Sequence, residues 1–241
     1  QLVARGAAPL IDHGIAASAR CRVDAISSRS ADAARAAAAN LGIERAYGSY
    51  DDVLADPDID AVYNPLPNHM HTEWNLAAIR AGKHVLAEKP FAMNTAETEA
   101  VFAEAQRHGV KVVEAFMYRT HPTWRLVKRL VDDGTIGELR HVQTYFGYRN
   151  DDPANIRNIA EYGGGALMDV GCYGINSACL LFGGNPEVVG ATIDRHCLRL
   201  ACAQPPQIGY RQPHRAQRRR AGMGDAPRRH EHRIIAAGQR E

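Results

Sequence analysis

Features typical of secreted, zinc-binding and membrane proteins are missing from this sequence of 241 residues. Its five cysteines are odd in number and form no Cys-x-x-Cys pair, which argues against a disulfide framework or a zinc site. No uninterrupted apolar run approaches the roughly 18 residues that span a bilayer. The start of the chain shows no secretory pattern. We therefore expect reduced thiols, no metal, no membrane partner and a cytoplasmic location.

A glycine-rich phosphate-binding turn is also missing near the start. Residues 1–21 contain Gly6-Ala7-Ala8 but no G-x-G-x-x-G, and no convincing strand leads into such a turn. Either the motif precedes Gln1 and the chain is truncated, or this segment is damaged.

Acidic residues are scarce toward the end of the chain. From residue 195 on, eleven Arg stand against three acids, a net charge of +8, so the overall +2 leaves −6 for residues 1–194. We expect residues 197–241 to form a basic tail without a period of 2 or 3.6, either disordered or translated out of frame. Nucleic-acid binding through residues 218–220 is disfavoured, because no aromatic residue interleaves these arginines.

What the sequence does contain is an alternation of helices and short apolar strands. The expected strands cover residues 22–28, 60–64, 84–87 and 110–114. The expected helices cover residues 31–41, 51–55, a segment ending at 81, 94–108 and 122–131. Such alternation with short connections is typical of a parallel sheet wound with helices. We predict an α/β fold, with a Rossmann-like domain over residues 1–117 that lacks its first strand.

The pattern changes after Gly137. Residues 139–148 alternate polar with aromatic or aliphatic side chains, as in a strand with one solvated face, and residues 188–193 are a further candidate strand. Residues 162–165 form a glycine loop that leads into an expected helix over 166–182. We predict an incomplete α+β domain with an open sheet over residues 118–196.

A pair of charges follows the expected strand at residues 84–87. Glu88, Lys89 and Pro90 come directly after it, which delivers an acid and a base to the carboxyl edge of the sheet, where open α/β sheets bind ligands. The alternative is a solvated Glu–Lys pair in a turn. Asn94, with Glu97 three residues later, predicts a capping box at the start of the next helix.

Four segments together resemble a known family. They are residues 28–30, 64–71, 88–90 and 163–173, with the motifs P-N-x-x-H, E-K-P and G-G-G-A-x-x-D-x-G. In this order and spacing, residues 22–193 resemble the Gfo/Idh/MocA family of glucose-fructose oxidoreductase, inositol dehydrogenase and rhizopine-catabolism proteins. The resemblance implies a Rossmann domain that holds NADP or NAD, followed by an α/β domain that often builds a homo-oligomer. Because the second sheet is incomplete here, we leave oligomerisation open for this chain.

The implied reaction is hydride transfer between the nicotinamide and a carbon that bears a hydroxyl group in a sugar, polyol or vicinal diol. Lys89 matches the family's catalytic lysine, and Glu88 would orient it. Many relatives carry His four residues past the motif's Asp169, whereas this sequence has Tyr173, as in the dihydrodiol dehydrogenase-like branch. An adjacent ammonium would favour the ionised phenol. The resemblance thus implies proton transfer by Tyr173 and hydroxyl binding by Asp169; the alternative for Tyr173 is a buried core tyrosine.

The resemblance also implies a set of binding residues. The residues expected beside the cofactor are Ser28, Arg29, Asn64, Leu66, Asn68, His71, Glu88, Lys89, Pro90 and Arg119. Arg29 would accommodate a 2′-phosphate, and no carboxylate stands at residues 28–30, so NADP is favoured over NAD; otherwise Arg29 caps a turn. Arg157 is expected to join Lys89, Asp169 and Tyr173 at the substrate, unless it is a solvated arginine.

Two further interpretations of the protein's function remain open. One is a non-catalytic nucleotide-sensing module of the same fold, and the other is an inactive fragment. Retention of Lys89, Asp169 and Tyr173 together argues against the loss of catalysis.

Overall fold

The structure of the chain is a computed structural model that describes residues 21–194 and 197–203. These residues form two compact units that interleave along the chain. The first contains residues 21–121 and 149–172, and the second contains residues 122–148 and 173–203. Residues 149–172 group with the first unit, and the predicted division at residues 117 and 196 stays a prediction. The predicted absence of the first strand concerns residues 1–20, which lie outside the described residues, as does the tail beyond residue 203.

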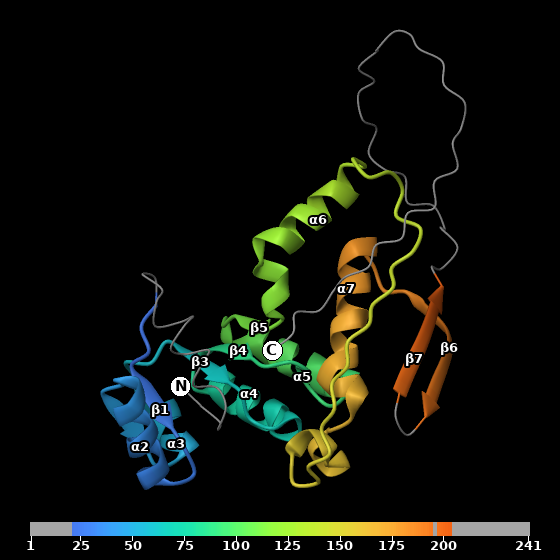
Figure 1. Cartoon of the computed structure of the whole chain (residues 1–241). Coiled ribbons are helices and arrows are strands. Elements are labelled where there is room, and N and C mark those ends of the chain that lie inside the picture. The colour runs from blue at the N-terminus through green and yellow to red at the C-terminus, as the bar shows by residue number, and fades with distance from the viewer. Residues whose placement is uncertain (1–20, 195–196, 204–241) are drawn as a thin grey trace, which may run out of the picture. The chain divides into compact units, whose positions relative to one another are not determined.

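The strands of the first unit run parallel, as predicted for a Rossmann-like fold (Figure 1). They are β1 (Ala25–Ser27), β2 (Arg45–Tyr47), β3 (Ala61–Asn64), β4 (His84–Ala87) and β5 (Val112–Glu114). β1 pairs with β2, and β3, β4 and β5 pair in that order, with Ala61 opposite His84 and Val85 opposite Val112. The α/β fold class is therefore confirmed.

Three of the four α-helices described in this unit begin at a capping side chain. The four helices are α2 (Ala31–Leu41), α3 (Tyr50–Ala55), α4 (His71–Arg80) and α5 (Thr95–His108), with short turns η2 (Asn68–Met70), η3 (Met117–Thr120), η4 (Ile156–Asn158) and η5 (Ala160–Tyr162). Those with a capping side chain are α2, α3 and α5. The predicted capping box is confirmed, because Asn94 Oδ1 accepts the Glu97 N–H at 2.9 Å. The Glu97 carboxylate accepts hydrogen bonds in return from Asn94 Nδ2 and from the Met93 N–H.

The main apolar core contains residues of β1, β3, β4, α3, α4 and α5, and a smaller cluster of Ile26, Ala38 and Ile43 packs at α2. The most buried members of the main core are Ala25, Val53, Val62, Ala78, Ile79, Ala87 and Val101. Parallel strands are covered by helices on both faces, so their side chains are apolar on both sides. Full burial of a Val or Ile side chain stabilises a fold by about 1.5–3 kcal/mol. This core holds the carboxyl ends of β3, β4 and β5 at one edge.

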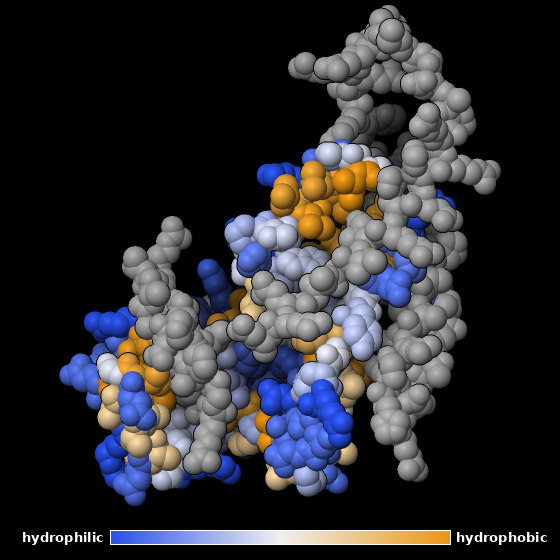
Figure 2. All heavy atoms as spheres, in the orientation of Figure 1, coloured by the Kyte–Doolittle hydropathy of each residue, from blue (hydrophilic) through white to orange (hydrophobic). Residues whose placement is uncertain are grey.

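The second unit contains α6 (Pro122–Asp132), most of α7 (Cys172–Phe182) and the hairpin of β6 (Glu187–Asp194) and β7 (Cys197–Ala203). Apolar atoms gather on the surface over α6 (Figure 2). No side chain of this fully described helix is buried, and Leu126 is 43% exposed.

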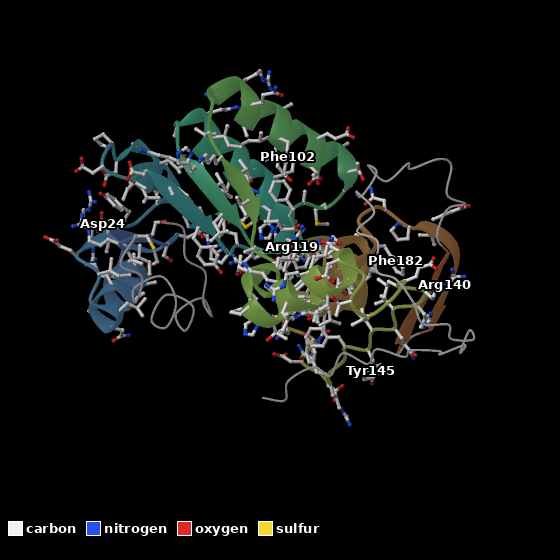
Figure 3. All side chains as sticks on the ribbon, turned by 90° about the horizontal axis from the view of Figure 1, so that it is seen from above. Asp24, Phe102, Arg119, Arg140, Tyr145 and Phe182 are labelled. Atoms are coloured by element: carbon white, nitrogen blue, oxygen red, sulfur yellow. The ribbon has the colours of Figure 1, made fainter. Side chains whose placement is uncertain are left out.

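Two predictions for this region are wrong. Residues 139–148 form no strand but an irregular extended chain with one bridge residue at 143, and Tyr145 is 84% exposed (Figure 3). Their alternating pattern finds no partner strand within the described part of the chain. Conversely, residues 197–203, expected to begin the tail, form β7, which pairs antiparallel with β6. Backbone pairing needs an adjacent strand and not a particular side-chain period.

The predicted helix over residues 166–182 starts with a wider turn. Residues Leu167–Gly171 form a π-helical turn, η6, that continues into α7. By length and composition alone, the helical segment Ala160–Phe182 could cross a membrane, a test that core helices of soluble proteins also pass. The predicted absence of a membrane partner stays a prediction.

The N-cap of α5 provides a stability test. Asn94→Ala removes the acceptor of the Glu97 N–H, so we expect the free energy of unfolding to fall by about 1 kcal/mol in urea titration. Glu99→Ala, on the exposed surface of the same helix, is the matched control and should change it by less than about 0.5 kcal/mol. Equal effects of the two substitutions would contradict the capping role.

Candidate active site

The carboxyl ends of three parallel strands bring polar side chains to one edge of the first unit. β3 ends at Asn64, β4 is followed by Glu88 and Lys89, and β5 ends at Glu114. The strands pair in register, and the ladder continues past their ends, where Glu88 N donates to Asn64 O at 2.9 Å and Ala115 N donates to Ala87 O at 2.8 Å. This is the edge at which open α/β sheets bind ligands.

The ammonium of Lys89 is held by Asp169. Lys89 Nζ lies 3.1 Å from Asp169 Oδ1 and donates to the carbonyl oxygen of the same residue at 2.5 Å. The two side chains are 15% and 14% exposed, so the pair is shielded but still reached by solvent. Arg157 Nε approaches the same Oδ1 at 3.2 Å. The carboxylate of Asp169 therefore lies against two cations, one at the strand edge and one from η4.

Glu88 holds the backbone of this lysine. Its Oε2 accepts the Lys89 N–H at 3.2 Å, and its Oε1 accepts the Tyr63 hydroxyl at 2.6 Å. The solvated Glu–Lys pair considered from the sequence is not what the structure contains. Glu88 orients Lys89 through the main chain, ahead of a cis Lys89–Pro90 peptide bond.

Asn64 and His71 hold the turns behind the edge. Asn64 donates to Asn75 Oδ1 at 2.8 Å and accepts the Leu66 N–H at 3.2 Å. The two ring nitrogens of His71 lie 2.8 and 2.7 Å from the carbonyl oxygens of Pro90 and Leu66. Burial lowers the pKa of His71, and its contacts with these two carbonyl oxygens raise it by less. Both side chains are fully buried, and direct contact with a cofactor, as predicted, would require the turns to open.

Residues 149–172 dock onto the turn after β3. Asn68 Nδ2 donates to Gly163 O at 2.8 Å, and the His69 ring stacks on Tyr162 at 4.5 Å. Gly163 adopts φ +74°, and a Cβ atom there would collide with the Met93 sulfur. This docking explains how Asp169 reaches a lysine that precedes it by 80 positions.

The end of β1 suits a phosphate-bearing cofactor. Arg29 follows that strand, is exposed, and forms no ion pair with any residue that the structure describes. Ser28 N donates to Tyr47 O at 3.1 Å, and Ser30 caps α2. An unpaired guanidinium in place of a carboxylate fits a 2′-phosphate better than a ribose hydroxyl. The segment expected to carry the pyrophosphate turn lies outside the described residues.

The remaining predicted residues lie in different places. Leu66 is buried at 5% exposure behind the edge, Arg119 is exposed on η3 (Figure 3), and Tyr173 is the second residue of α7. Tyr173 belongs to the second unit, where its ring packs edge-on against Phe146 with 5.6 Å between the ring centroids. Its approach to Lys89, and the roles of all these residues in binding or catalysis, stay predictions.

Two residues at this edge of the sheet, Tyr63 and Glu114, were not identified from the sequence. Tyr63 supports Glu88, and Glu114 accepts the Phe91 N–H at 2.9 Å. The sequence could have indicated Glu114, because it is the last residue of an expected parallel strand, just as Glu88 directly follows the expected strand at residues 84–87.

Two family models match most of the sequence. A model described as an oxidoreductase family with an NAD-binding Rossmann fold matches residues 5–116. A model described as the GFO/IDH/MocA C-terminal domain matches residues 124–201.

Curated and solved relatives resemble the same part of the chain. A D-xylose 1-dehydrogenase (NADP(+)) of Haloferax volcanii is 47% identical over 70% of this chain and 51% of its own length. A trans-1,2-dihydrobenzene-1,2-diol dehydrogenase of Xenopus tropicalis is 34% identical, over 79% and 55%. A 3-ketoreductase from Actinomadura kijaniata, whose crystal structure contains NADP and TDP-benzene, is 39% identical. The match has a TM-score of 0.65 and covers 78% of this chain and 56% of that one. The chain therefore spans about half the length of the relatives it matches.

The docked glycine gives a test of this arrangement. Gly163→Ala places a Cβ atom at positive φ, against Met93 and Asn68, and we expect it to lower the free energy of unfolding by about 1 to 3 kcal/mol. Hydrogen exchange should rise in residues 149–172. In the control Gly184→Ala, φ is not positive and no atom lies within 4 Å of the new Cβ, so the change should stay below about 1 kcal/mol. A similar response in both variants would argue against the docking.

Proposed function

The chain belongs to the Gfo/Idh/MocA oxidoreductase family, and from that premise we propose that it transfers a hydride between a nicotinamide cofactor and a sugar or vicinal diol. The observation that carries the proposal is the shielded contact of Lys89 with Asp169 at the carboxyl edge of the Rossmann-like sheet, 3.1 Å between Nζ and Oδ1. A lysine that only served solubility would extend into solvent. The substrate class is supported by relatives named for xylose, for a cyclic diol and for ketosugar reduction.

We assign the protein's share of the reaction to three side chains. The bound nicotinamide supplies the hydride acceptor at its C4 position. Lys89 donates a hydrogen bond to the substrate hydroxyl oxygen and stabilises the negative charge that develops there. Tyr173, as phenolate, accepts the hydroxyl proton while the hydrogen on the same carbon leaves with its bonding electron pair as hydride, so the alcohol becomes a carbonyl. Asp169 accepts a hydrogen bond from a neighbouring hydroxyl and keeps the ammonium in place.

We propose NADP as the preferred cofactor. Arg29 offers an exposed guanidinium with no ion-pair partner among the described residues, and such a group binds a phosphate through charge-assisted hydrogen bonds. The relative that acts on xylose is named for NADP(+), and the solved 3-ketoreductase contains NADP. A cytoplasmic location remains a proposal, and oligomerisation stays open for this chain.

Replacing the lysine separates binding from chemistry. Lys89→Met removes the ammonium but keeps most of the side-chain volume, so turnover of sugars or diols should fall by about 10²–10⁴-fold. The affinity for NADPH, measured by fluorescence titration, should change by only a few-fold.

The matched control is Lys111→Met, an exposed lysine just before β5 at the opposite end of the strand. It should leave both quantities unchanged. If Lys89→Met turns over substrate like the control, the catalytic assignment is wrong.

Cofactor choice is tested at Arg29. Arg29→Ala should weaken NADPH binding by about 10- to 100-fold, as expected for the loss of a hydrogen bond to a charged group. NADH binding should hardly change, because NADH lacks the 2′-phosphate. Parallel titrations with both cofactors provide the measurement, and equal losses for the two would overturn the NADP preference.

A further inference from the structure

Glu114, on β5, is hydrogen-bonded to the turn at residues 89–91 that carries Lys89. It is the last residue of β5, and its Oε1 accepts the backbone N–H of Phe91 at 2.9 Å. Phe91 comes two residues after Lys89. The position of Glu114 is itself fixed, because Ala115 N donates to Ala87 O at 2.8 Å and extends the ladder between β4 and β5.

Each residue of this turn has a backbone group held by a side chain. Glu88 Oε2 accepts the Lys89 N–H at 3.2 Å, and a ring nitrogen of His71 lies 2.8 Å from Pro90 O. Glu114 completes the series at Phe91. Three side chains, from the residue after β4, from α4 and from β5, therefore set the path of the main chain from which Lys89 extends.

The backbone N–H of Phe91 needs a hydrogen-bond acceptor within the protein. Phe91 is only 6% exposed, and its ring stacks on Phe102 of α5 with 5.0 Å between the ring centroids, so its N–H has little access to water. A buried N–H without an acceptor costs about 1–3 kcal/mol. A carboxylate forms a shorter and stronger hydrogen bond to an N–H than a neutral oxygen does.

We infer that Glu114 is a positioning residue for Lys89: through the Phe91 backbone it fixes the turn that aims the ammonium, without touching substrate itself. The effect on turnover rests on the function proposed above. The hold on the turn does not, because it is a property of the folded chain alone.

The charge of Glu114 gives this hold a pH signature. Burial raises the pKa of Glu114 and is the largest effect; the hydrogen bond from the Phe91 N–H and the charge of Arg119 lower it, Glu88 raises it, and the net shift is upward. Below the ordinary carboxyl range the group is protonated in both the folded and the unfolded chain, and above its raised pKa it is ionised in both. Between these limits the unfolded chain has already lost the proton that the folded chain still holds. The contribution of Glu114 to the free energy of unfolding therefore falls as pH rises through that window.

The direct test is a pH titration of the Phe91 amide by NMR on the full chain. The amide proton should move upfield as Glu114 is protonated, with a midpoint above the ordinary Glu value of about 4.3. In Glu114→Gln the neutral side-chain oxygen still accepts the N–H, so the resonance should remain protected from exchange but lose this titration. Glu114→Ala should lose both the protection and the titration.

Turnover distinguishes positioning from a merely structural role. We expect Glu114→Ala to lower kcat by about 10- to 100-fold with little change in the KM for NADPH, because a displacement of about 1 Å at the reacting group costs that much. Glu114→Gln should recover most of kcat. The control Val113→Ala, which alters a side chain 55% exposed on the same strand, should behave as the unaltered protein.

Each outcome decides the inference. A Phe91 amide that does not titrate in the unaltered chain, or equal kcat losses in the Ala and Gln variants, would overturn it. If Glu114→Ala does not fold, the titrations of the unaltered chain and of Glu114→Gln still decide. If the unaltered chain binds no cofactor and turns over no sugar, the proposed function fails, while the amide titration still tests whether Glu114 holds the turn.

Discussion

The contact between Lys89 and Asp169 is the constraint on which the candidate site depends. It joins residues 80 positions apart in sequence, the first from the end of a parallel strand and the second from a π-helical turn. The carboxylate also meets Arg157, so the site has two cations around one acid. An ammonium held in this way is restricted in direction yet still reached by solvent, which suits a group that must meet a substrate oxygen.

Much of the polar chemistry at the edge serves the backbone. Glu88, His71 and Glu114 each bind a main-chain group of the turn at residues 89–91, and Asn64 binds the N–H of Leu66. Such contacts are individually worth about 0.5–1.5 kcal/mol, but they act on one short segment. Lys89, the side chain proposed to meet the substrate, thereby extends from a backbone that these residues hold, and Arg29 at the end of β1 is exposed.

Local signals in the sequence predicted the parts of the fold that depend on local physics. The capping box of Asn94 and Glu97 and the strand before Glu88 were recovered because caps and apolar runs act over a few residues. Residues 139–148 and 197–203 were misjudged, since strand formation depends on a partner that a period of 2 does not reveal. The resemblance implied that Asp169 and Lys89 share a substrate site but not that they form an ion pair, and the contact of Glu114 required the geometry of the neighbouring turn.

The central claim is that this edge of the sheet supports direct hydride transfer from a carbohydrate carbon to the nicotinamide. The most direct measurement is to incubate the chain with NADP and aldoses or cyclic diols deuterated at every carbon, and to examine the recovered reduced cofactor by mass spectrometry and NMR. The account predicts one deuterium per turnover at C4 of the nicotinamide. Reduced cofactor without deuterium, or no reduction with any of these substrates, would contradict it.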